Sequence, residues 1–222
     1  MSFYNKEYFE TPEAPTLEGI SEVKDLPCLL KYLEPKEEDK ILDIGCGIGR
    51  LTKTIAKEGA KVIGIDISKY AIEQAKITYK NQENLEFICK NALEIDYNCY
   101  FNKVFCFHNI EHFSIDDARL LLKKIHLALK DNGILVLGLP INDDYFIRRT
   151  IHFLAKRRSW KHYGHLTSFS IQGIKDEIEA AGFKITDIYK ISYFSIKVPE
   201  AIPQIPLLGI PTICIDICAQ KK

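Results

Sequence analysis

Short apolar runs alternate with amphipathic segments along the chain from residue 39 onward, and this alternation constrains the fold more than any other feature. Most of the apolar runs are continuous, which is typical of parallel strands buried on both faces of a sheet. The segments between them have the 3.6-residue period of helices, and regular exchange of the two patterns indicates βαβ units. We therefore predict an α/β fold: a Rossmann-like, doubly wound, mostly parallel seven-stranded sheet with helices on both faces. The predicted strands are 40–44, 61–65, 85–89, 103–107, 133–139, 183–195 and 212–220.

The predicted helices have residues with capping preferences near their ends. Ser68 is a candidate N-cap, Asp116 and Asp117 precede the third amphipathic stretch, and Gly182 ends the fourth. The predicted helices are 49–59, 68–80, 116–130 and 170–181.

Composition excludes several functional classes. The 30 basic and 30 acidic side chains give a formal net charge of zero, so no global field attracts nucleic acid or an acidic membrane. Seven cysteines, an odd number without a CxxC pair, favour reduced and buried thiols over disulfides or structural zinc. The first residues lack the apolar region of a signal peptide. We expect a cytoplasmic protein and no metal.

A glycine-rich turn follows the first predicted strand in the stretch KILDIGCGIGRLTK. Such a strand-to-helix turn lets backbone approach a ligand closely. The dinucleotide pattern GxGxxG is not met, because Arg50 stands where its third glycine would be and Gly49 lies one residue earlier. Asp43, at the end of the strand, would repel a pyrophosphate. It suits a ligand that carries a cation.

The second predicted strand ends in Asp66, which is placed to accept hydrogen bonds from both hydroxyls of a ribose. Ile67, the next residue, could pack against one face of an adenine. A ligand with a ribose, an adenine and a cationic amino acid part matches S-adenosylmethionine. The loop and Asp66 together therefore predict this cofactor and its product, S-adenosylhomocysteine.

The chain resembles the class I S-adenosylmethionine-dependent methyltransferases, particularly the small-molecule branch that includes quinone-pathway O-methyltransferases. The resemblance covers about residues 38–195. It rests on blocks in the family's order: ILDIGCGIG, VIGIDIS, FICKNALEI, FNKVFCFHNIEHF and LKDNGILVLGLP.

The resemblance implies roles for individual residues in cofactor binding. The first block would cradle the methionine part, Asp66 would hold the ribose and Ile67 would cover the adenine. Where the family commonly has an acidic residue before a small one, this chain has Asn91 and Ala92, and the Asn91 amide oxygen can accept the same hydrogen bond. The predicted cofactor-binding residues are Asp43, Gly45, Cys46, Gly47, Gly49, Asp66, Ile67, Asn91, Ala92, Phe107 and His108, with Asn109 beside them under the sulfonium.

Three residues are candidates for catalysis. Glu111 and His112 follow the fourth predicted strand at the ligand-binding edge, where His112 could be a general base and Glu111 could position the acceptor. A structural alternative makes them a helix-capping pair and a packing histidine. His165, before the helix at 170–181, is the other candidate base, and a capping or solvent-facing role is its alternative.

Two further segments are candidates for acceptor contact. The stretch 145–162 is rich in Arg and Lys, and a helix there could cap an anionic acceptor, touch a membrane surface or simply present a solvated basic face. The apolar, proline-rich stretch 197–211 could line a lipophilic pocket, contact lipid or pack in a dimer. The oligomeric state is left open.

We expect residues 1–222 to form a single class I methyltransferase domain. Its parts are an N-terminal lid or helix (1–38), a cofactor-binding core (39–140), a helical acceptor-side insertion (141–168) after the fifth strand and the rest of the sheet (169–222). The first hypothesis is an enzyme that methylates a small anionic or lipophilic acceptor, preferably on oxygen. The alternatives are an RNA or protein methyltransferase using the basic 145–162 segment, with nucleic acid not favoured, and a noncatalytic cofactor-binding subunit.

Overall fold

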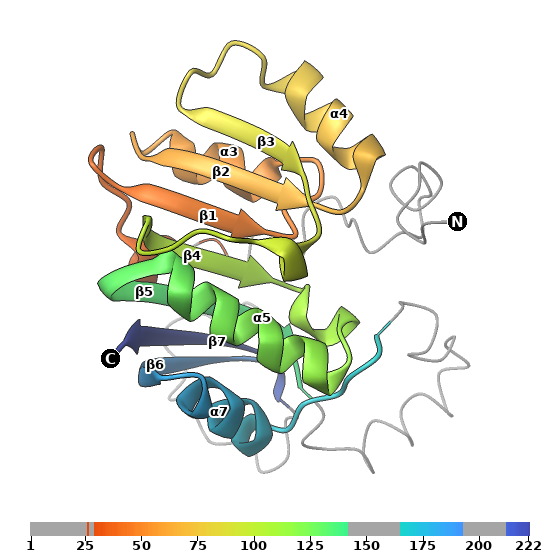
Figure 1. The fold of residues 1–222 in the computed structure, drawn as a ribbon, viewed down its shortest axis with the longest axis vertical. Coiled ribbons are helices and arrows are strands. Elements are labelled where there is room, and N and C mark those ends of the chain that lie inside the picture. Colours follow the sequence, from red (N-terminus) through yellow and green to blue (C-terminus); the bar gives the residue numbers. More distant parts are fainter. Residues whose placement is uncertain (1–25, 27–28, 142–164, 193–211) are drawn as a thin grey trace, which may run out of the picture.

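A seven-stranded sheet forms the centre of the molecule in the computed structural model, which describes residues 26, 29–141, 165–192 and 212–222. The strand order is β3-β2-β1-β4-β5-β7-β6 (Figure 1). Neighbouring strands from β3 to β5 pair in parallel, and β7 pairs antiparallel with both β5 and β6. The predicted mostly parallel, Rossmann-like sheet is therefore confirmed.

The helices and strands follow the predicted alternation. The strands are β1 (Lys40–Ile44), β2 (Lys61–Asp66), β3 (Leu85–Cys89), β4 (Phe101–Phe107), β5 (Leu129–Pro140), β6 (Phe183–Ser192) and β7 (Thr212–Lys221). The helices are α3 (Arg50–Ala56), α4 (Lys69–Thr78), α5 (Ile115–Ala128) and α7 (Ile171–Ala180), with short 3-10 helices η1 (Ala92–Glu94) and η2 (Ile110–His112).

Helices cover both faces of the sheet. Helices α5 and α7 lie in front of it in Figure 1, and α3 lies behind β2. On the front face, Leu42 of β1 belongs to one buried cluster with Leu121 and Ile125 of α5. On the back face, Ile41 packs in a second cluster with Ile55 of α3. Adjacent β1 residues thus enter opposite cores, and each buried side chain of this kind contributes roughly 2 kcal/mol.

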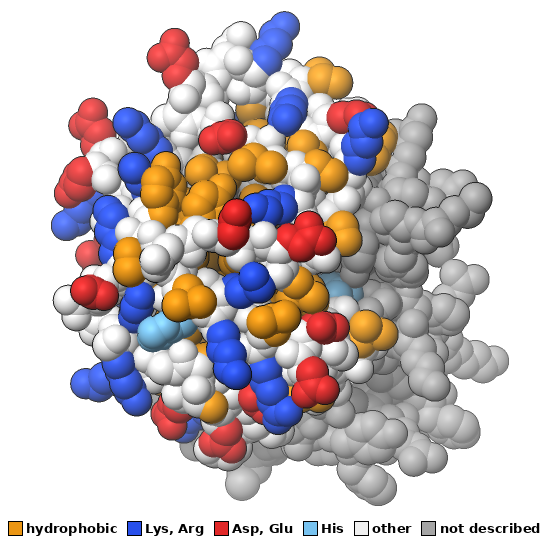
Figure 2. All heavy atoms as spheres, in the orientation of Figure 1, with side chains coloured by type: hydrophobic (Ala, Val, Ile, Leu, Met, Phe, Trp, Pro, Cys, Tyr) orange, Lys and Arg blue, Asp and Glu red, His pale blue; other side chains and the backbone are white. Residues whose placement is uncertain are grey.

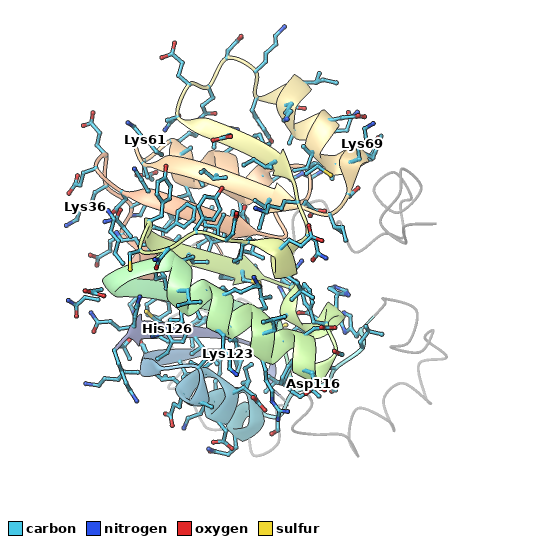
Figure 3. The ribbon with its side chains drawn as sticks, in the orientation of Figure 1. Lys36, Lys61, Lys69, Asp116, Lys123 and His126 are labelled. Atoms are coloured by element: carbon cyan, nitrogen blue, oxygen red, sulfur yellow. The ribbon has the colours of Figure 1, made fainter. Side chains whose placement is uncertain are left out.

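The parallel strands bring their carboxyl ends to one edge of the sheet. Figure 3 shows Lys61 at the start of β2 and Lys69 beyond its end, at the start of α4. The same figure shows Asp116 in the first turn of α5 and His126 near its other end, so α5 runs back toward the opposite edge. The turns after β1, β2 and β4 therefore meet at a common edge, where ligands bind in open α/β sheets.

Several boundary predictions need correction. Helix α5 starts at Ile115, one residue before its predicted start, and is capped by Ser114, whose side chain accepts from the Asp117 backbone N–H. The chain leaves α5 after Ala128, and β5 already begins at Leu129. Ser68 caps α4 as predicted, with its side chain accepting from Ala71 N–H.

The cysteine prediction was wrong in part. Cys106 is buried as expected, whereas Cys89 is exposed because β3 is an edge strand, and Cys99 is exposed as well.

Most of the predicted N-terminal lid or helix (1–38), most of the predicted insertion and the stretch 197–211 lie outside the described residues. Of the first segment, residues 26 and 29–38 are described, and Leu29 and Leu33 pack in the same buried cluster as Ile41. Within the described part of the chain, no helix is long and apolar enough to cross a membrane.

Candidate functional site

The glycine-rich loop after β1 adopts backbone conformations that favour glycine. Gly45, Gly47 and Gly49 all have positive φ, at 77°, 52° and 83°. A Cβ atom on Gly45 would collide with the side-chain amide of Asn109, and one on Gly49 would lie 2.6 Å from the Phe87 ring. The loop therefore packs closely between β3 and the turn after β4, and its conformation requires residues without side chains at these positions.

Asp66 anchors this loop from the end of β2. Its Oδ2 accepts from the Gly47 N–H at 2.8 Å, and its Oδ1 accepts from the Ser68 N–H at 2.8 Å. Burial raises the pKa of Asp66, while these backbone donors oppose the rise. Each carboxylate oxygen keeps capacity for a second hydrogen bond, so a ribose diol can still bind. Ile67 beside it is 55% exposed, which leaves an apolar surface for a base.

Asp43 lies beneath the loop with a buried carboxyl group. Only 4% of the residue is exposed, and its Oδ2 accepts from the Thr52 hydroxyl at 2.6 Å. Burial raises the pKa of Asp43 to about 7, against the effect of the Thr52 hydrogen bond, and the nearby Asp66 adds to the rise. A cationic ligand group would favour the ionised carboxylate. The acid, the Asp66 acceptors and the glycine turn together fit the predicted cofactor.

The turns after β3 and β4 complete this edge of the sheet. The Asn91 side-chain oxygen caps η1 by accepting from the Leu93 N–H at 3.0 Å, and Ala92 is buried behind it. Phe107 ends β4 with 8% exposure. His108 follows with a positive φ of 48° and donates its backbone N–H to the Gly138 carbonyl at 2.8 Å.

A cluster of one carboxyl group and three imidazoles lies just past β4. Glu111 is 2% exposed, and its Oε2 finds no hydrogen-bond partner among the described residues. Its Oε1 lies 3.8 Å from His108 Nδ1 and 4.0 Å from His165 Nε2, too far for hydrogen bonds. The His165 ring packs edge-on against His112 at 4.9 Å. We call these four residues the Glu111 cluster.

Burial shifts the protonation of the Glu111 carboxyl group. It raises the pKa of Glu111 to about 7, and the charge of His108 opposes the rise. A carboxyl group with that pKa can accept or release a proton near neutral pH. The ligand atoms of Glu111, His112 and His165 also lie within 4.8 Å of one another, so the same three side chains could hold a metal ion.

The segment 165–169, which we call the strap, docks directly onto η2. The Leu166 and Thr167 N–H groups donate to the Glu111 carbonyl at 2.9 and 3.1 Å, and the Thr167 hydroxyl donates to the Phe113 carbonyl at 2.7 Å. A bridge between Ile141 and Phe169 holds the far end of the strap beside β5. The strap thus places His165 in the Glu111 cluster.

The predicted site residues fall into several groups along the same edge. The loop after β1 and Asp66 form one group, whereas the predicted cofactor residue His108 lies beside the catalytic candidates Glu111, His112 and His165 at η2. Asn91 and Ala92 lie at η1, after β3.

Glu111 and His112 lie inside the 3-10 helix η2, whose N-cap is Asn109 and whose C-cap is Phe113, so they are not the helix-capping pair of their structural alternative, although His112 does pack against another ring. Sequence reasoning missed Thr52, the hydroxyl donor to Asp43, because nothing in the sequence distinguishes it from other helical threonines.

Comparison with known proteins agrees with this geometry. A family described as "Methyltransferase domain" matches residues 41–133. A ubiquinone biosynthesis O-methyltransferase from Bradyrhizobium diazoefficiens is 35% identical over 100 residues, which are 45% of this chain and 39% of the relative. The chain thus spans less than half the length of that relative.

Solved structures share the fold. The YcgJ protein from Bacillus subtilis superposes with a TM-score of 0.68 at 21% identity over 90% of this chain and 99% of its own. A 1,6-didemethyltoxoflavin-N1-methyltransferase from Burkholderia thailandensis, solved with bound 1,6-didemethyltoxoflavin and S-adenosylhomocysteine, superposes with a TM-score of 0.64 at 18% identity. The match covers 88% of this chain and 76% of that protein. Residues 41–133 therefore match a methyltransferase domain, and the chain is similar over part of its length to a ubiquinone biosynthesis O-methyltransferase and shares the fold of a methyltransferase of known structure.

Proposed function

We propose that the protein methylates a small-molecule acceptor on oxygen, with S-adenosylmethionine as methyl donor and an anionic or lipophilic acceptor. The observation that carries the proposal is a buried carboxyl group, Glu111, at the same sheet edge as the glycine-rich loop. When bound, the cofactor supplies an electrophilic methyl group on a sulfonium. The chain must hold that group, exclude water and deal with the acceptor's proton.

Binding falls to the loop after β1 and to Asp66. The loop conformation is preset by the Asp66 hydrogen bond to Gly47, so little backbone freedom remains to be lost on binding. The Asp66 carboxylate accepts hydrogen bonds from the ribose hydroxyls. Asp43, buried beneath the loop, supplies negative charge for the cationic part of the cofactor. Fixing the donor in one orientation against the acceptor provides much of the rate enhancement of a displacement reaction.

Proton acceptance falls to the Glu111 cluster. A hydroxyl acceptor must lose its proton as it attacks, whereas a neutral amine can attack directly. Glu111 is buried and its pKa is raised to about 7, so near neutral pH the ionised fraction can take that proton. Of the neighbouring imidazoles, His108 has a 34% exposed side chain and can pass the proton on to water.

The proposal is tested by transfer of labelled methyl groups to phenolic, lipid, glycan and RNA acceptors. We expect label in a hydroxyl-bearing small molecule, with Glu111→Gln slowing transfer about 100-fold, the low end of the effect of a general base. Asp131→Asn, which changes an exposed carboxylate near the start of β5, is the matched control and should transfer normally. Label found only on amines, or equal rates in wild type and Glu111→Gln, would contradict oxygen-directed chemistry.

The RNA or protein methyltransferase alternative depends on the basic 145–162 segment, which lies outside the described residues. On the face seen in Figure 2, positive and negative side chains are interspersed over the described part rather than gathered by sign. Transfer of labelled methyl groups to RNA, or to protein added to the same screen, therefore decides this alternative. Membrane contact through 145–162 or 197–211 stays a prediction. Turnover of any acceptor would remove the noncatalytic alternative.

A further inference from the structure

Thr52, in the first turn of α3, donates its hydroxyl to the acid beneath the glycine-rich loop. The residue is fully buried, and its Oγ1 lies 2.6 Å from Oδ2 of Asp43. An O–H···O distance of this length is typical of a charge-assisted hydrogen bond to a carboxylate. Because Asp43 lies in β1 and α3 packs in the same buried cluster as β1, the bond joins the helix to the strand end that precedes the loop.

The other groups that face the Asp43 carboxyl group do not stabilise its charge. Burial raises the pKa of Asp43 most, and the negative charge of Asp66 at the end of β2 raises it further. Burial and neighbouring carboxyl groups raise the pKa of the Cys46 and Cys106 thiols well above the usual range, so both thiols stay neutral. Against these effects, the Thr52 hydrogen bond lowers the pKa of Asp43. Of the effects on Asp43 within the described part of the chain, this bond is therefore the one that favours the ionised form.

We propose that Thr52 is a positioning residue for cofactor binding, because its hydroxyl fixes the Asp43 carboxylate and favours its ionised form. This inference rests on the proposed cofactor for its consequence, whereas the hydrogen bond does not depend on it. A carboxylate held by a buried donor has little side-chain freedom left to lose when a cationic ligand binds. The charge is then in place before the cationic part of S-adenosylmethionine arrives. Thr52 acts through Asp43 and need not touch the cofactor.

Thr54 provides a matched control in the same helix. Its hydroxyl donates to the Arg50 carbonyl at 3.0 Å, so this bond stays within α3. Thr52→Val and Thr54→Val each remove one hydroxyl and keep a β-branched side chain. Thr52→Ser keeps the hydroxyl and deletes a buried methyl group, which lowers stability without removing the donor. The three variants therefore separate the hydrogen bond to Asp43 from packing and from helix stability.

The hydrogen bond is tested first in the full chain without cofactor, by nuclear magnetic resonance titration of isotope-labelled aspartate carboxyl groups. The Asp43 signal is assigned by its loss in Asp43→Asn. Thr52→Val should raise the pKa of Asp43 by about one pH unit, because a donor to the ionised form is lost. Thr52→Ser and Thr54→Val should leave this pKa at about 7. An unchanged Asp43 pKa in Thr52→Val would overturn the proposal, whatever ligand the protein binds.

The consequence for binding is tested by calorimetric titration with S-adenosylhomocysteine at pH 7 and pH 9. Thr52→Val should bind about fivefold more weakly than wild type at pH 7 and within about twofold of it at pH 9, where Asp43 is ionised in both proteins. Thr52→Ser and Thr54→Val should match wild type at both pH values. A loss of equal size at pH 7 and pH 9, or an equal loss in Thr52→Ser, would overturn positioning in favour of a structural role. A shifted Asp43 pKa with no S-adenosylhomocysteine binding by wild type would contradict the proposed cofactor alone.

Discussion

The loop after β1 and the Glu111 cluster lie at one edge of one sheet, yet they are built in opposite ways. The loop is held by short backbone hydrogen bonds, and both Asp66 oxygens have backbone donors at 2.8 Å. In the cluster, the Glu111 carboxyl is buried with its nearest imidazoles at 3.8 and 4.0 Å. In the proposed function, the first region binds the cofactor in a preset conformation, and the second region's buried acid takes the acceptor's proton.

The largest expected effect comes from filling the loop. Gly45→Ala places a Cβ against the Asn109 amide at a φ of 77°, so the loop must shift. We expect cofactor affinity to fall more than about 100-fold, because a displacement of about 1 Å in a binding group can have an effect of that size. Gly59→Ala is the matched control, because Gly59 also has a positive φ of 101° but a Cβ there would lie 3.6 Å from Glu37. The control should cost about 1 kcal/mol of stability and leave binding intact. Calorimetric titration with S-adenosylhomocysteine measures the affinity of both variants, and thermal unfolding measures their stability. Normal binding by Gly45→Ala would contradict the role of the loop.

The buried acid of the cluster should lower the stability of the ligand-free protein at neutral pH. The pKa of Glu111 is about 7 in the folded state and 4.5 in its ordinary state, so between these values the unfolded chain ionises first. Stability conferred by the protonated form is complete below pH 4.5, falls as pH rises and levels off above pH 7. Glu111→Gln should remove that slope and raise the unfolding free energy at pH 8 by about 3 kcal/mol. Urea unfolding at pH 5 and pH 8 checks this, with Asp131→Asn as control, and a parallel slope in Glu111→Gln would refute it.

Asp43 should make cofactor binding depend on pH. Its pKa is about 7 in the free protein, and a cationic ligand binds the ionised form, so affinity should rise about tenfold from pH 6 to pH 8 and then level off. Asp43→Asn should give weaker binding with a flat pH dependence. Titrations in buffers of different ionisation enthalpy would detect the released proton, and equal pH profiles in the two proteins would exclude Asp43 as its source.

The smallest effect is expected at Asn91. The residue uses its side-chain oxygen to cap η1, and an aspartate can accept the same Leu93 hydrogen bond while offering a charged oxygen to an adenine amino group. Asn91→Asp should therefore tighten S-adenosylhomocysteine binding by about threefold, under 1 kcal/mol. Weaker binding by this variant would mean that Asn91 serves only as a cap.

The same comparison shows what the sequence could predict. The loop and Asp66 belong to consecutive strands of a parallel sheet, so their meeting follows from the βαβ pattern. The strand ends of β1 and β3 and the Ser68 cap were predicted for the same reason, because local patterns determine them. Sequence alone can therefore predict that side chains at the ends of two strands joined by one βαβ crossover lie close together.

The Glu111 cluster was only partly predictable. Each member could be proposed from its place after a strand or before a helix, but no local pattern indicates that the His165 imidazole packs beside Glu111. That contact arises from the strap's backbone hydrogen bonds to a carbonyl, which carry no side-chain signature. The exposure of Cys89 was missed for a related reason, since its apolar run does not reveal that β3 ends the sheet.

The most direct test of the account measures S-adenosylhomocysteine affinity in three proteins by calorimetry: wild type, Asp66→Ala and Glu111→Gln. The account predicts a loss of about 100-fold in Asp66→Ala, the value of two hydrogen bonds to a charged group, and wild-type affinity in Glu111→Gln. Equal affinity in Asp66→Ala and wild type, or a comparable loss in Glu111→Gln, would contradict the division of this edge into a binding region and a proton-accepting region.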